Sequence, residues 1–481
     1  MIIKDILDCL DVKIKKSIFL IIIIMELDNK IKDKLLSYQV NHVTNLISIL
    51  NKNITALDSS DTGTGKTYTA IAICAQLKLK PIILCPKSVI YTWKKVCETF
   101  GVEPFMIVNY ETIKIGKYYK NGNRQKCPYI EVKNEEFKWK LDYKDKIFIF
   151  DEVHRCNNIE TLNGKLLYYT KQSMPKVNML LLSATVSDHP EKFRIFFYIL
   201  NFIDPDQVMK QNLSYEKYQY ILTKWIFRDA RPLFRINGML YPDRAARMRI
   251  DVLGDLFPET QITAQPYTVD KKREIEIERE YSVIQKELDR LRDKKDKDKM
   301  NVLVKILRSQ QKIELLKAPL FVELANDFLE NKFSIVIFVN YTQTLKLISK
   351  MLNTTCLIWG EQTGDERDKN IRNFMENKER VIICNIKAGS VGLSLHDVQG
   401  GHPRVSLISP TWSSIDLTQA LGRIHRAGGK SKSLQRIVYV ANTVEERIAD
   451  KVQKKIKDIN TINNGDLDLT NIVFERERKK L

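Results

Sequence analysis

The sequence from Asp58 to Thr69 reads D-S-S-D-T-G-T-G-K-T-Y-T and contains the clearest chemical pattern in the chain. Glycines allow a backbone to curl until its N–H groups face phosphate oxygens, and the N-terminus of the following helix adds a positive dipole. Lys66 would then reach the β- and γ-phosphates of a nucleotide, and the Thr67 hydroxyl would hold Mg²⁺. A glycine is usual at the position of Ser60, so the loop alone leaves an ordinary strand-to-helix turn as an alternative.

Two acidic residues follow a segment that should form a buried strand. Lys146 to Phe150 is apolar and β-branched, and Asp151 and Glu152 come directly after it. Ligands bind at the carboxyl ends of strands in α/β sheets, so Asp151 is placed to hold the water shell of Mg²⁺. Glu152 is then placed to polarise the water that attacks a phosphate. A helix start is the alternative, because acidic residues are also common caps.

The size and charge of the chain bound its class. A chain of 481 residues should hold two or three domains with cores of their own. The net charge of +19 favours a polyanionic partner, of which nucleic acid is the usual one. A basic surface kept for solubility, or a genome rich in codons for Lys, Ile and Asn, would give the same charge.

Cysteine usage and the N-terminal segment indicate an intracellular compartment, either cytoplasm or nucleus. The eight cysteines include no C-x-x-C pair, which is typical of reduced thiols and not of a disulfide framework or a zinc site. Residues 17–25 are strongly apolar but too short for a membrane span, and no small-residue cleavage site follows them. We interpret residues 1–24 as an extension or a mis-assigned start that precedes Met25.

Predicted strands and helices alternate through the first part of the chain. Apolar residues at helical spacing run from Ile31 to Leu50 and include Gln39, whose amide could read an adenine edge or simply lie on a helix surface. Pro81 to Cys85 and Asn178 to Leu182 are predicted strands, and the second ends in Ser183-Ala184-Thr185. Hydroxyls at that strand tip could bridge the nucleotide site to a second ligand, or form a plain turn.

Residues 186–330 interrupt this alternation. Basic and aromatic side chains are interleaved between residues 224 and 249, which suits a phosphate backbone or a solvated face with structural aromatics. Apolar residues from Ile277 to Leu291 step by four and three, the run 292–299 is polar, and helical spacing resumes from Met300 to Leu316. We therefore predict an antiparallel helical hairpin that projects from the body.

A second α/β region begins at Ser334 and has no phosphate loop of its own. Its predicted strands are Ser334–Val339, Thr355–Trp359, Arg380–Cys384, Arg404–Ile408 and Gln435–Val440. Near its end, Gln419, Arg423 and Arg426 would fall on one face of a helix at i, i+4 and i+7. Two guanidiniums so aligned could clamp a γ-phosphate and stabilise the charge that develops in transfer; a surface helix with two arginines is the alternative.

These patterns occur in the order that is characteristic of superfamily 2 helicases, and the chain resembles the Swi/Snf-type ATPases among them. S-D-T-G-T-G-K-T resembles motif I, Gln39 resembles the adenine-reading glutamine, and Pro81 to Trp93 resembles motif Ia. Asp151 to His154 resembles motif II, and Ser183 to Thr185 resembles motif III. In the second region the resemblance extends to Gly360 with Arg367 and Phe374, to motif V at 387–393, to motif VI at 410–426, and to 443–446.

The resemblance covers about residues 30–455 and implies an α/β fold with two tandem RecA-like parallel-sheet lobes and a helical insertion between them. The implied segments are the extension 1–24, the ATP-binding lobe 25–190, the linker and helical-hairpin protrusion 191–330, the second lobe 331–460 and a charged tail 461–481. ATP and nucleic acid would bind in the cleft between the lobes.

The matched motifs also imply site residues. The nucleotide-binding set is Gln39 with Thr62, Gly63, Thr64, Gly65, Lys66 and Thr67, and Mg²⁺ would be held at Thr67 and Asp151. The catalytic set is Lys66, Asp151, Glu152, Gln419, Arg423 and Arg426. Nucleic acid would contact Pro86, Lys87 and Ser88 in motif Ia, Lys387, Ala388 and Gly389 in motif V, and Trp412 in motif VI.

Departures from the family pattern bear on the kind of motor. Residues 427–430 read A-G-G-K where the family usually has Gly-Gln, and D-T-G-T-G-K-T replaces the remodellers' more usual D-E-M-G-L-G-K-T. We see no bromodomain-, chromodomain- or zinc-like module in the sequence. The chain therefore resembles the compact Swi/Snf-like helicases of large DNA viruses, whose proteins can be packaged in the virion.

From these patterns we predict a motor that hydrolyses ATP to translocate on duplex DNA, which it could also unwind or remodel. An RNA helicase of transcription or messenger processing shares the same core and is the first alternative. A subunit of a transcription complex that uses ATP only as a switch is the second, and the motif II glutamate and motif VI arginines count against it. Transcription or replication complexes would supply protein partners, and no membrane partner is expected.

Overall fold

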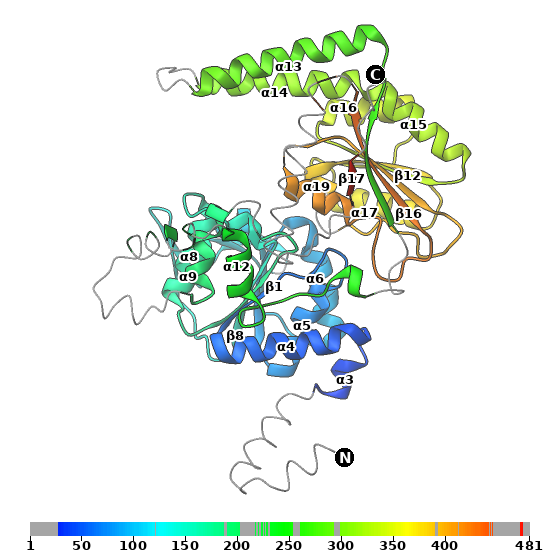
Figure 1. Ribbon diagram of the computed structural model, residues 1–481. Coiled ribbons are helices and arrows are strands. Elements are labelled where there is room, and N and C mark those ends of the chain that lie inside the picture. The colour runs from blue at the N-terminus through cyan, green and yellow to red at the C-terminus, as the bar shows by residue number, and fades with distance from the viewer. Residues whose placement is uncertain are drawn as a thin grey trace, which may run out of the picture. The chain divides into compact units, whose positions relative to one another are not determined.

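The computed structural model in Figure 1 describes most of the chain. The described residues are 27–120, 122–186, 190–202, 217, 220, 223, 224, 226, 228, 231–253, 260–292, 299–389, 393–411, 413–441, 443, 445 and 472–474. Within these residues no helix is both long and apolar enough to cross a membrane. The predicted extension 1–24, most of the tail 461–481 and Trp412 lie outside the described residues.

The chain divides into two compact units. Unit 1 comprises residues 1–61 and 65–249, and unit 2 comprises residues 62–64 and 250–481. The division at residue 249 falls inside the segment 191–330 that the sequence analysis treats as one linker and protrusion. Each unit is built on its own parallel sheet.

In the described part of the chain, the sheet of unit 1 has six strands in the order β10-β1-β9-β8-β2-β3, and every neighbouring pair is parallel. The strands are β1 (Thr55–Asp58), β2 (Lys80–Cys85), β3 (Met106–Asn109), β8 (Lys146–Asp151), β9 (Asn178–Leu182) and β10 (Ala245–Ala246). The four residues from Ile147 to Phe150 are fully buried, as expected of a parallel strand that is covered on both faces. Residues that follow β1, β8 and β9 therefore meet at one edge of the sheet.

The helices of unit 1 connect these strands. They are α3 (Asn29–Lys32), α4 (Ser37–Asn53), α5 (Lys66–Leu77), α6 (Ile90–Phe100), α7 (Tyr110–Ile113), α8 (Leu162–Ser173), α9 (Arg194–Ile199) and α12 (Pro232–Leu240), with 3₁₀ turns η1 (Lys87–Val89), η2 (Val153–Cys156) and η3 (Pro190–Phe193). The single helix expected from Ile31 to Leu50 is thus divided into α3 and α4. Two antiparallel hairpins, β4 (Lys117–Lys120) with β5 (Asn123–Lys126) and β6 (Ile130–Lys133) with β7 (Glu136–Trp139), precede β8.

Among the described residues, the sheet of unit 2 has seven strands in the order β13-β14-β12-β15-β16-β11-β17, all paired in parallel. They are β11 (Thr260–Tyr267), β12 (Ser334–Val339), β13 (Leu357–Ile358), β14 (Val381–Asn385), β15 (Arg404–Ile408), β16 (Ser433–Val440) and β17 (Ile472–Phe474). Its helices are α13 (Lys271–Arg292), α14 (Lys299–Leu316), α15 (Ala318–Glu330), α16 (Thr342–Met351), α17 (Gly364–Met375), α18 (Ile386–Gly389) and α19 (Ser414–Leu421), with the 3₁₀ turn η4 (Ile250–Val252). All five predicted strands of this region lie at β12 to β16, and β11 comes as an addition from a segment that the sequence analysis left without strands.

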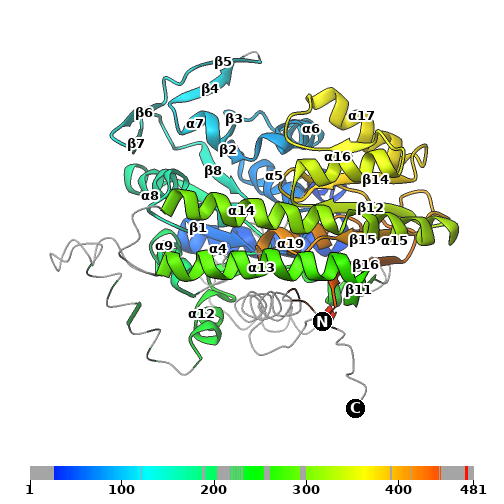
Figure 2. The same ribbon diagram turned by 90° about the horizontal axis from the view of Figure 1, so that it is seen from above.

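The predicted helical hairpin is confirmed as α13 and α14, which lie side by side along their lengths (Figures 1 and 2). Its seam is closed by the buried side chains of Ile277, Tyr281, Ile284, Val302, Ile306 and Ile313. A buried ion pair fixes its base to the end of β16, because Nζ of Lys317 lies 2.8 Å from Oε1 of Glu445. The Tyr281 hydroxyl donates to the same oxygen (3.2 Å).

Candidate ATP and nucleic-acid site

The phosphate loop, residues 59–65, connects β1 to α5. Gly63 and Gly65 have left-handed backbones, with φ of 92° and 91°. Side chains rarely adopt this conformation, so both positions favour glycine. At Gly65 an added Cβ would also lie 2.2 Å from Nε2 of Gln39, so a side chain there would have to displace that amide. The backbone of the loop therefore has the curl that a phosphate-binding loop requires.

Ser60, which replaces the usual glycine, is bound into the base of this loop. Its N–H donates to Oδ1 of Asp58 (3.0 Å), and its Oγ accepts from the N–H of Met248 (2.9 Å). The same Oγ lies 3.2 Å from Nε2 of His42. The backbone of Ser60 does not take a positive φ, so glycine is not needed at this position. Ser60 therefore departs from the strict pattern without disrupting the loop, and it adds hydrogen bonds at the base of the loop.

Asp58 is the buried carboxylate beneath the loop. Nε2 of His42 lies 3.1 Å from its Oδ1, and the Thr69 hydroxyl donates to its Oδ2 (3.2 Å). Burial opposes ionisation of Asp58, but the His42 ring, the Lys66 ammonium and the Ser60 hydrogen bond hold its pKa below the ordinary value. A charged Asp58 therefore anchors both α4 and α5 to the end of β1.

Lys66 interacts electrostatically with four carboxylates of unit 1. Its Nζ donates to the backbone carbonyls of Ser60 (2.7 Å) and Asp61 (3.1 Å). Burial lowers the pKa of Lys66, and the carboxylates of Asp58, Glu152, Asp61 and Asp151 oppose that shift. Phosphate oxygens form stronger, charge-assisted hydrogen bonds with an ammonium than carbonyls do. The lysine can therefore exchange its present partners for a nucleotide phosphate.

Asp151 and Glu152 lie where β8 ends. Glu152 has a left-handed backbone (φ 55°) and turns the chain into η2. Burial, and next the charge of Glu152, raise the pKa of Asp151 to about 7, although the Trp93 N–H and the Lys66 ammonium oppose this shift. Two adjacent carboxylates whose charges are not fully balanced suit a divalent cation. Asp151, with Thr67 on the first turn of α5, would hold Mg²⁺, which neutralises phosphate charge when bound.

Two buried aromatic side chains hold Asp151. The indole Nε1 of Trp93, on α6, donates to Oδ2 of Asp151 (2.9 Å). The hydroxyl of Tyr110, at the start of α7, donates to the backbone carbonyl of the same residue (2.8 Å). Neither aromatic side chain is exposed. Neither was selected from the sequence as a site residue, because 58 and 41 positions separate the partners.

A polar chain links motif II to motif III. Nδ1 of His154 lies 3.3 Å from Oε2 of Glu152 and 3.0 Å from Oγ of Ser183. The Ser183 hydroxyl donates in turn to the carbonyl of Thr185 (3.0 Å). The hydroxyl at the tip of β9 is therefore joined to the acidic pair through a histidine, which the strand tip alone did not predict.

Gln39 lies on the first turn of α4, against the phosphate loop. Its Oε1 accepts from the N–H of Leu36 (2.9 Å), and its Nε2 end faces Gly65. The side chain is buried. The structure thus brings together Gln39, Gly65, Lys66 and the acidic pair within unit 1.

Motif Ia follows β2. Pro86 is buried and immediately precedes η1, whereas Lys87 and Ser88 are exposed. The exposed face continues on α6 with Tyr91, which is 70% exposed, and with Lys95 one turn later. This outward face offers basic and aromatic side chains, and both kinds are common in contacts with nucleic acid.

The motif VI residues of unit 2 do not form the expected helical face. α19 ends at Leu421, so Gln419 lies in the helix while Arg423 and Arg426 lie beyond it. Each arginine side chain donates to the backbone carbonyl four residues before it. Nε of Arg423 donates to the carbonyl of Gln419 (2.8 Å), and Nε of Arg426 donates to the carbonyl of Gly422 (3.2 Å). The prediction of i, i+4 and i+7 spacing on one helix is therefore wrong, because α19 ends at Leu421, before either arginine.

Motif V follows β14. Its residues Lys387, Ala388 and Gly389 lie in α18, and Lys387 is exposed. Nη2 of Arg367 donates to the carbonyl of Ala388 (2.9 Å) and so braces this turn. Residues 390–392 of the motif lie outside the described part of the chain.

The carboxyl edge of the unit 2 sheet is organised by Glu314 of α14. Its Oε1 accepts from the backbone N–H (2.7 Å) and the side-chain Nδ2 (2.9 Å) of Asn340, and its Oε2 accepts from the N–H of Tyr341 (3.0 Å). Nδ2 of Asn340 also donates to the backbone carbonyl of Pro410 (3.0 Å). The backbone carbonyl of Asn340 accepts from Nδ2 of Asn385 (2.9 Å). These bonds join the base of the hairpin to the ends of β12, β14 and β15.

The basic residues at 224–249 do not share one role. Arg244 stacks on Phe202, with its guanidinium carbon 4.2 Å from the ring centroid. Nη2 of Arg247 forms a short ion pair with Oδ1 of Asp61 at the phosphate loop. These two arginines are built into unit 1, and Arg247 was missed as a residue that supports the loop.

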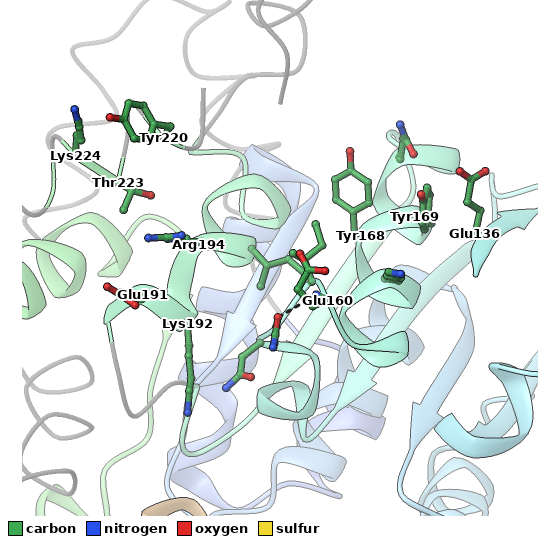
Figure 3. A pocket seen from close by; sticks show the side chains of 16 residues that line it. Glu136, Glu160, Tyr168, Tyr169, Glu191, Lys192, Arg194, Tyr220, Thr223 and Lys224 are labelled. Atoms are coloured by element: carbon green, nitrogen blue, oxygen red, sulfur yellow. Dashed lines mark hydrogen bonds between the residues drawn. The ribbon is translucent and has the colours of Figure 1, made fainter. Parts of the chain in front are cut away.

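Unit 1 also contains a separate cavity of about 1070 Å³ (Figure 3). It is bordered by Tyr168 and Tyr169 of α8, by Tyr220, and by charges of both signs that include Glu160 and Arg194. None of the predicted site residues lines it. The charges of both signs in its lining do not favour an anionic ligand over a cationic one.

Two family models and a solved structure resemble this chain. A family model described as type III restriction enzyme, res subunit, matches residues 32–188, and one described as helicase conserved C-terminal domain matches residues 311–428. The solved structure of S. cerevisiae Dbp5 bound to RNA and ADP BeF3 has a TM-score of 0.48 at 12% identity, with 94% of each chain covered.

Two relatives bear on the family. A protein of Acanthamoeba polyphaga mimivirus, named as a candidate ATP-dependent RNA helicase, is 42% identical over 465 residues, or 92% of this chain and 86% of that protein. A CHD3-type chromatin-remodeling factor of Arabidopsis thaliana is 23% identical over 87% of this chain, which spans 37% of the remodeling factor. The predicted family and fold class are confirmed. The chain belongs to the superfamily 2 helicases and is a nucleic-acid-dependent ATPase of that superfamily.

Proposed function

We propose that this helicase hydrolyses ATP with Mg²⁺ to translocate on duplex DNA. The observation that carries the ATP site is the convergence of Lys66 with Asp151 and Glu152 at one sheet edge, where their charges interact. Similarity to chromatin-remodeling factors supports duplex DNA, because chromatin presents DNA as a duplex.

In this proposal, each residue of unit 1 has a distinct role. The loop N–H groups and Lys66 bind the β- and γ-phosphates, and Gln39 recognises adenine. Thr67 and Asp151 hold Mg²⁺, and Glu152 polarises the attacking water. The link from Glu152 through His154 to Ser183 would orient the glutamate and connect it to β9.

The residues of motifs Ia, V and VI would supply the remaining contacts. Pro86, Lys87 and Ser88 in unit 1, and Lys387, Ala388, Gly389 and Trp412 in unit 2, would bind the nucleic-acid backbone. Arg423 and Arg426 would stabilise charge on the γ-phosphate during transfer, with Gln419 beside them in the sequence. These roles follow from the motif resemblance.

An RNA helicase is the second candidate function. The name of the mimivirus relative favours it, and that relative is matched over most of its length. Strand separation of an RNA duplex would distinguish it from a translocase that only tracks along DNA.

The test is the steady-state ATPase rate of the full chain without nucleic acid and with single-stranded DNA, duplex DNA or RNA. Lys66→Ala provides the blank, and Lys80→Ala, at the opposite end of the sheet and half-exposed, is the matched control. We expect the largest stimulation with duplex DNA, no rate for Lys66→Ala and a normal rate for Lys80→Ala. Stimulation chiefly by RNA would replace the translocase with the RNA helicase.

A further inference from the structure

Helix α6 has two faces with different chemistry. Its outward face continues from Lys87 and carries the exposed Tyr91. Its inward face carries Trp93, which is fully buried and donates its indole N–H to Oδ2 of Asp151 (2.9 Å). One short helix therefore joins the proposed nucleic-acid face directly to the carboxylate that would hold Mg²⁺.

The bond to Trp93 also leaves the carboxylate suitably arranged for a cation. A carboxylate has two oxygens, and the indole donates to only one of them. Tyr110 holds the backbone carbonyl of Asp151 (2.8 Å). Asp151 is thus fixed both through its side chain and through its main chain, by residues that follow β2 and β3.

A buried tryptophan needs an acceptor for its N–H in any protein, so the choice of acceptor is the informative point. Trp139 shows the structural case in the same unit: its Nε1 donates to the neutral hydroxyl of Thr170 (2.8 Å), away from the predicted site residues. Trp93 instead donates to a carboxyl group in the predicted site. Partners that orient a metal-binding carboxylate commonly alter metal affinity when they are removed.

We propose that Trp93 is a positioning residue that fixes the Asp151 carboxylate for Mg²⁺ and couples nucleic-acid binding on α6 to the ATP site. The proposal rests on the function proposed above, because it takes Asp151 as the Mg²⁺ residue. Nucleic acid bound to the outward face shifts α6, and the indole transmits that shift to the carboxylate.

The test uses the full chain with Trp93→Phe, and with Trp139→Phe as the matched control that also removes one buried indole. Binding of a fluorescent ATP analogue is titrated at a series of Mg²⁺ concentrations, and the stimulation of ATPase by duplex DNA is measured in parallel. For Trp93→Phe we expect the Mg²⁺ concentration that gives half-maximal nucleotide binding to rise about tenfold. Nucleotide binding without Mg²⁺ should be unchanged, and the fold stimulation by DNA should fall.

The control decides between positioning and packing. Trp139→Phe should leave both measurements at the values of the unsubstituted protein. A Trp93→Phe variant with unchanged Mg²⁺ dependence, or equal shifts in the two variants, would overturn the proposal. Should Trp93→Phe fail to fold, Tyr110→Phe, which removes only a hydroxyl, decides instead: a smaller shift in the same direction supports the proposal, and no shift overturns it.

The two proposals fail in different ways. Absence of Mg²⁺-dependent nucleotide binding in the unsubstituted protein would remove the ATP site itself, and the role of Trp93 with it. Normal binding and stimulation in that protein, with an unchanged Trp93→Phe variant, would remove only the positioning role.

Discussion

The two sheets share one architecture, but their carboxyl edges are completed in different ways. In unit 1 the edge collects charges that its own residues do not balance, since Lys66 borrows backbone carbonyls and the pKa of Asp151 is raised to about 7. In unit 2 the corresponding edge satisfies itself, because Glu314 accepts three N–H bonds from Asn340 and Tyr341. The edge of unit 1 is therefore the one proposed to bind a ligand, whereas the hydrogen-bonded edge of unit 2 supports the loops that follow it.

The sharpest way to break this comparison is to remove the reactive charge of unit 1. Glu152→Gln should lower ATP turnover by roughly 10²–10⁴-fold, because the amide cannot accept a proton from the attacking water. ATP binding should persist, since Lys66 and the loop are intact. Rapid-quench turnover and nucleotide titration measure the two effects. Normal hydrolysis by this variant would refute the assignment; Glu160→Gln, in the separate cavity, is the control.

Removal of the Glu314 carboxylate should lower the stability of unit 2. Glu314→Ala leaves the backbone N–H groups of Asn340 and Tyr341 without their acceptor, at a cost of about 3 kcal/mol in the free energy of unfolding. Urea denaturation should show the transition of unit 2 at lower concentration, and Glu330→Ala, at the exposed end of α15, should not shift it. An unshifted midpoint for Glu314→Ala would show that these bonds do not stabilise the edge.

Lys171, a buried lysine at the other end of the unit 1 sheet, should make the stability of that unit depend on pH. Burial lowers the pKa of Lys171 from 10.5 to about 8, and among the described residues its Nζ donates to the Thr55 hydroxyl alone (3.1 Å). The folded state therefore binds fewer protons than the unfolded state between about pH 8 and 10.5, so this residue makes stability rise with pH across that window. Below pH 8 the full cost remains, and Lys171→Met should stabilise unit 1 there by about 3 kcal/mol.

Thermal unfolding of the unsubstituted protein and of Lys171→Met at pH 7 and pH 10 measures this effect. The gain should shrink at the higher pH. A gain that is independent of pH would mean that packing, and not the charge of the lysine, is responsible.

The smallest effect concerns the position where the phosphate loop departs from its family pattern. Ser60→Gly restores the usual glycine but removes the acceptor of the Met248 N–H, so we expect a loss of about 1 kcal/mol in stability. The rate of ATP hydrolysis should not increase. A more active and equally stable variant would show that the serine impairs the loop.

Much of the fold follows from the sequence because it depends on local pattern. Continuous apolar runs predicted β8 and β12 within a residue of their observed limits. β11 escaped notice because T-Q-I-T-A-Q-P-Y is half polar and contains Pro266, although its partners lie in β16 and β17. Such pairings join residues more than 170 positions apart, which no local pattern reports.

In the candidate site, too, local pattern predicted some residues and long-range contacts hid others. Motifs predicted the residues that would touch ATP, since the spacing of Gly65, Lys66 and Thr67 is itself the chemical signal. The residues that hold them were not predicted: His42, Trp93 and Tyr110 act through contacts that exist only once the sheet has formed. The helical face of Arg423 and Arg426 failed because spacing alone does not show where a helix ends.

The left-handed backbone of Glu152 has a consequence for how this protein can change. That conformation costs a residue with a side chain about 1 kcal/mol relative to glycine. The glutamate at position 152 therefore carries a conformational cost, and a glycine at that position would avoid this cost. Selection for stability alone would favour Glu152→Gly at the expense of the carboxylate proposed to polarise water, so under the proposed function a glutamate is expected at this position only where turnover is under selection.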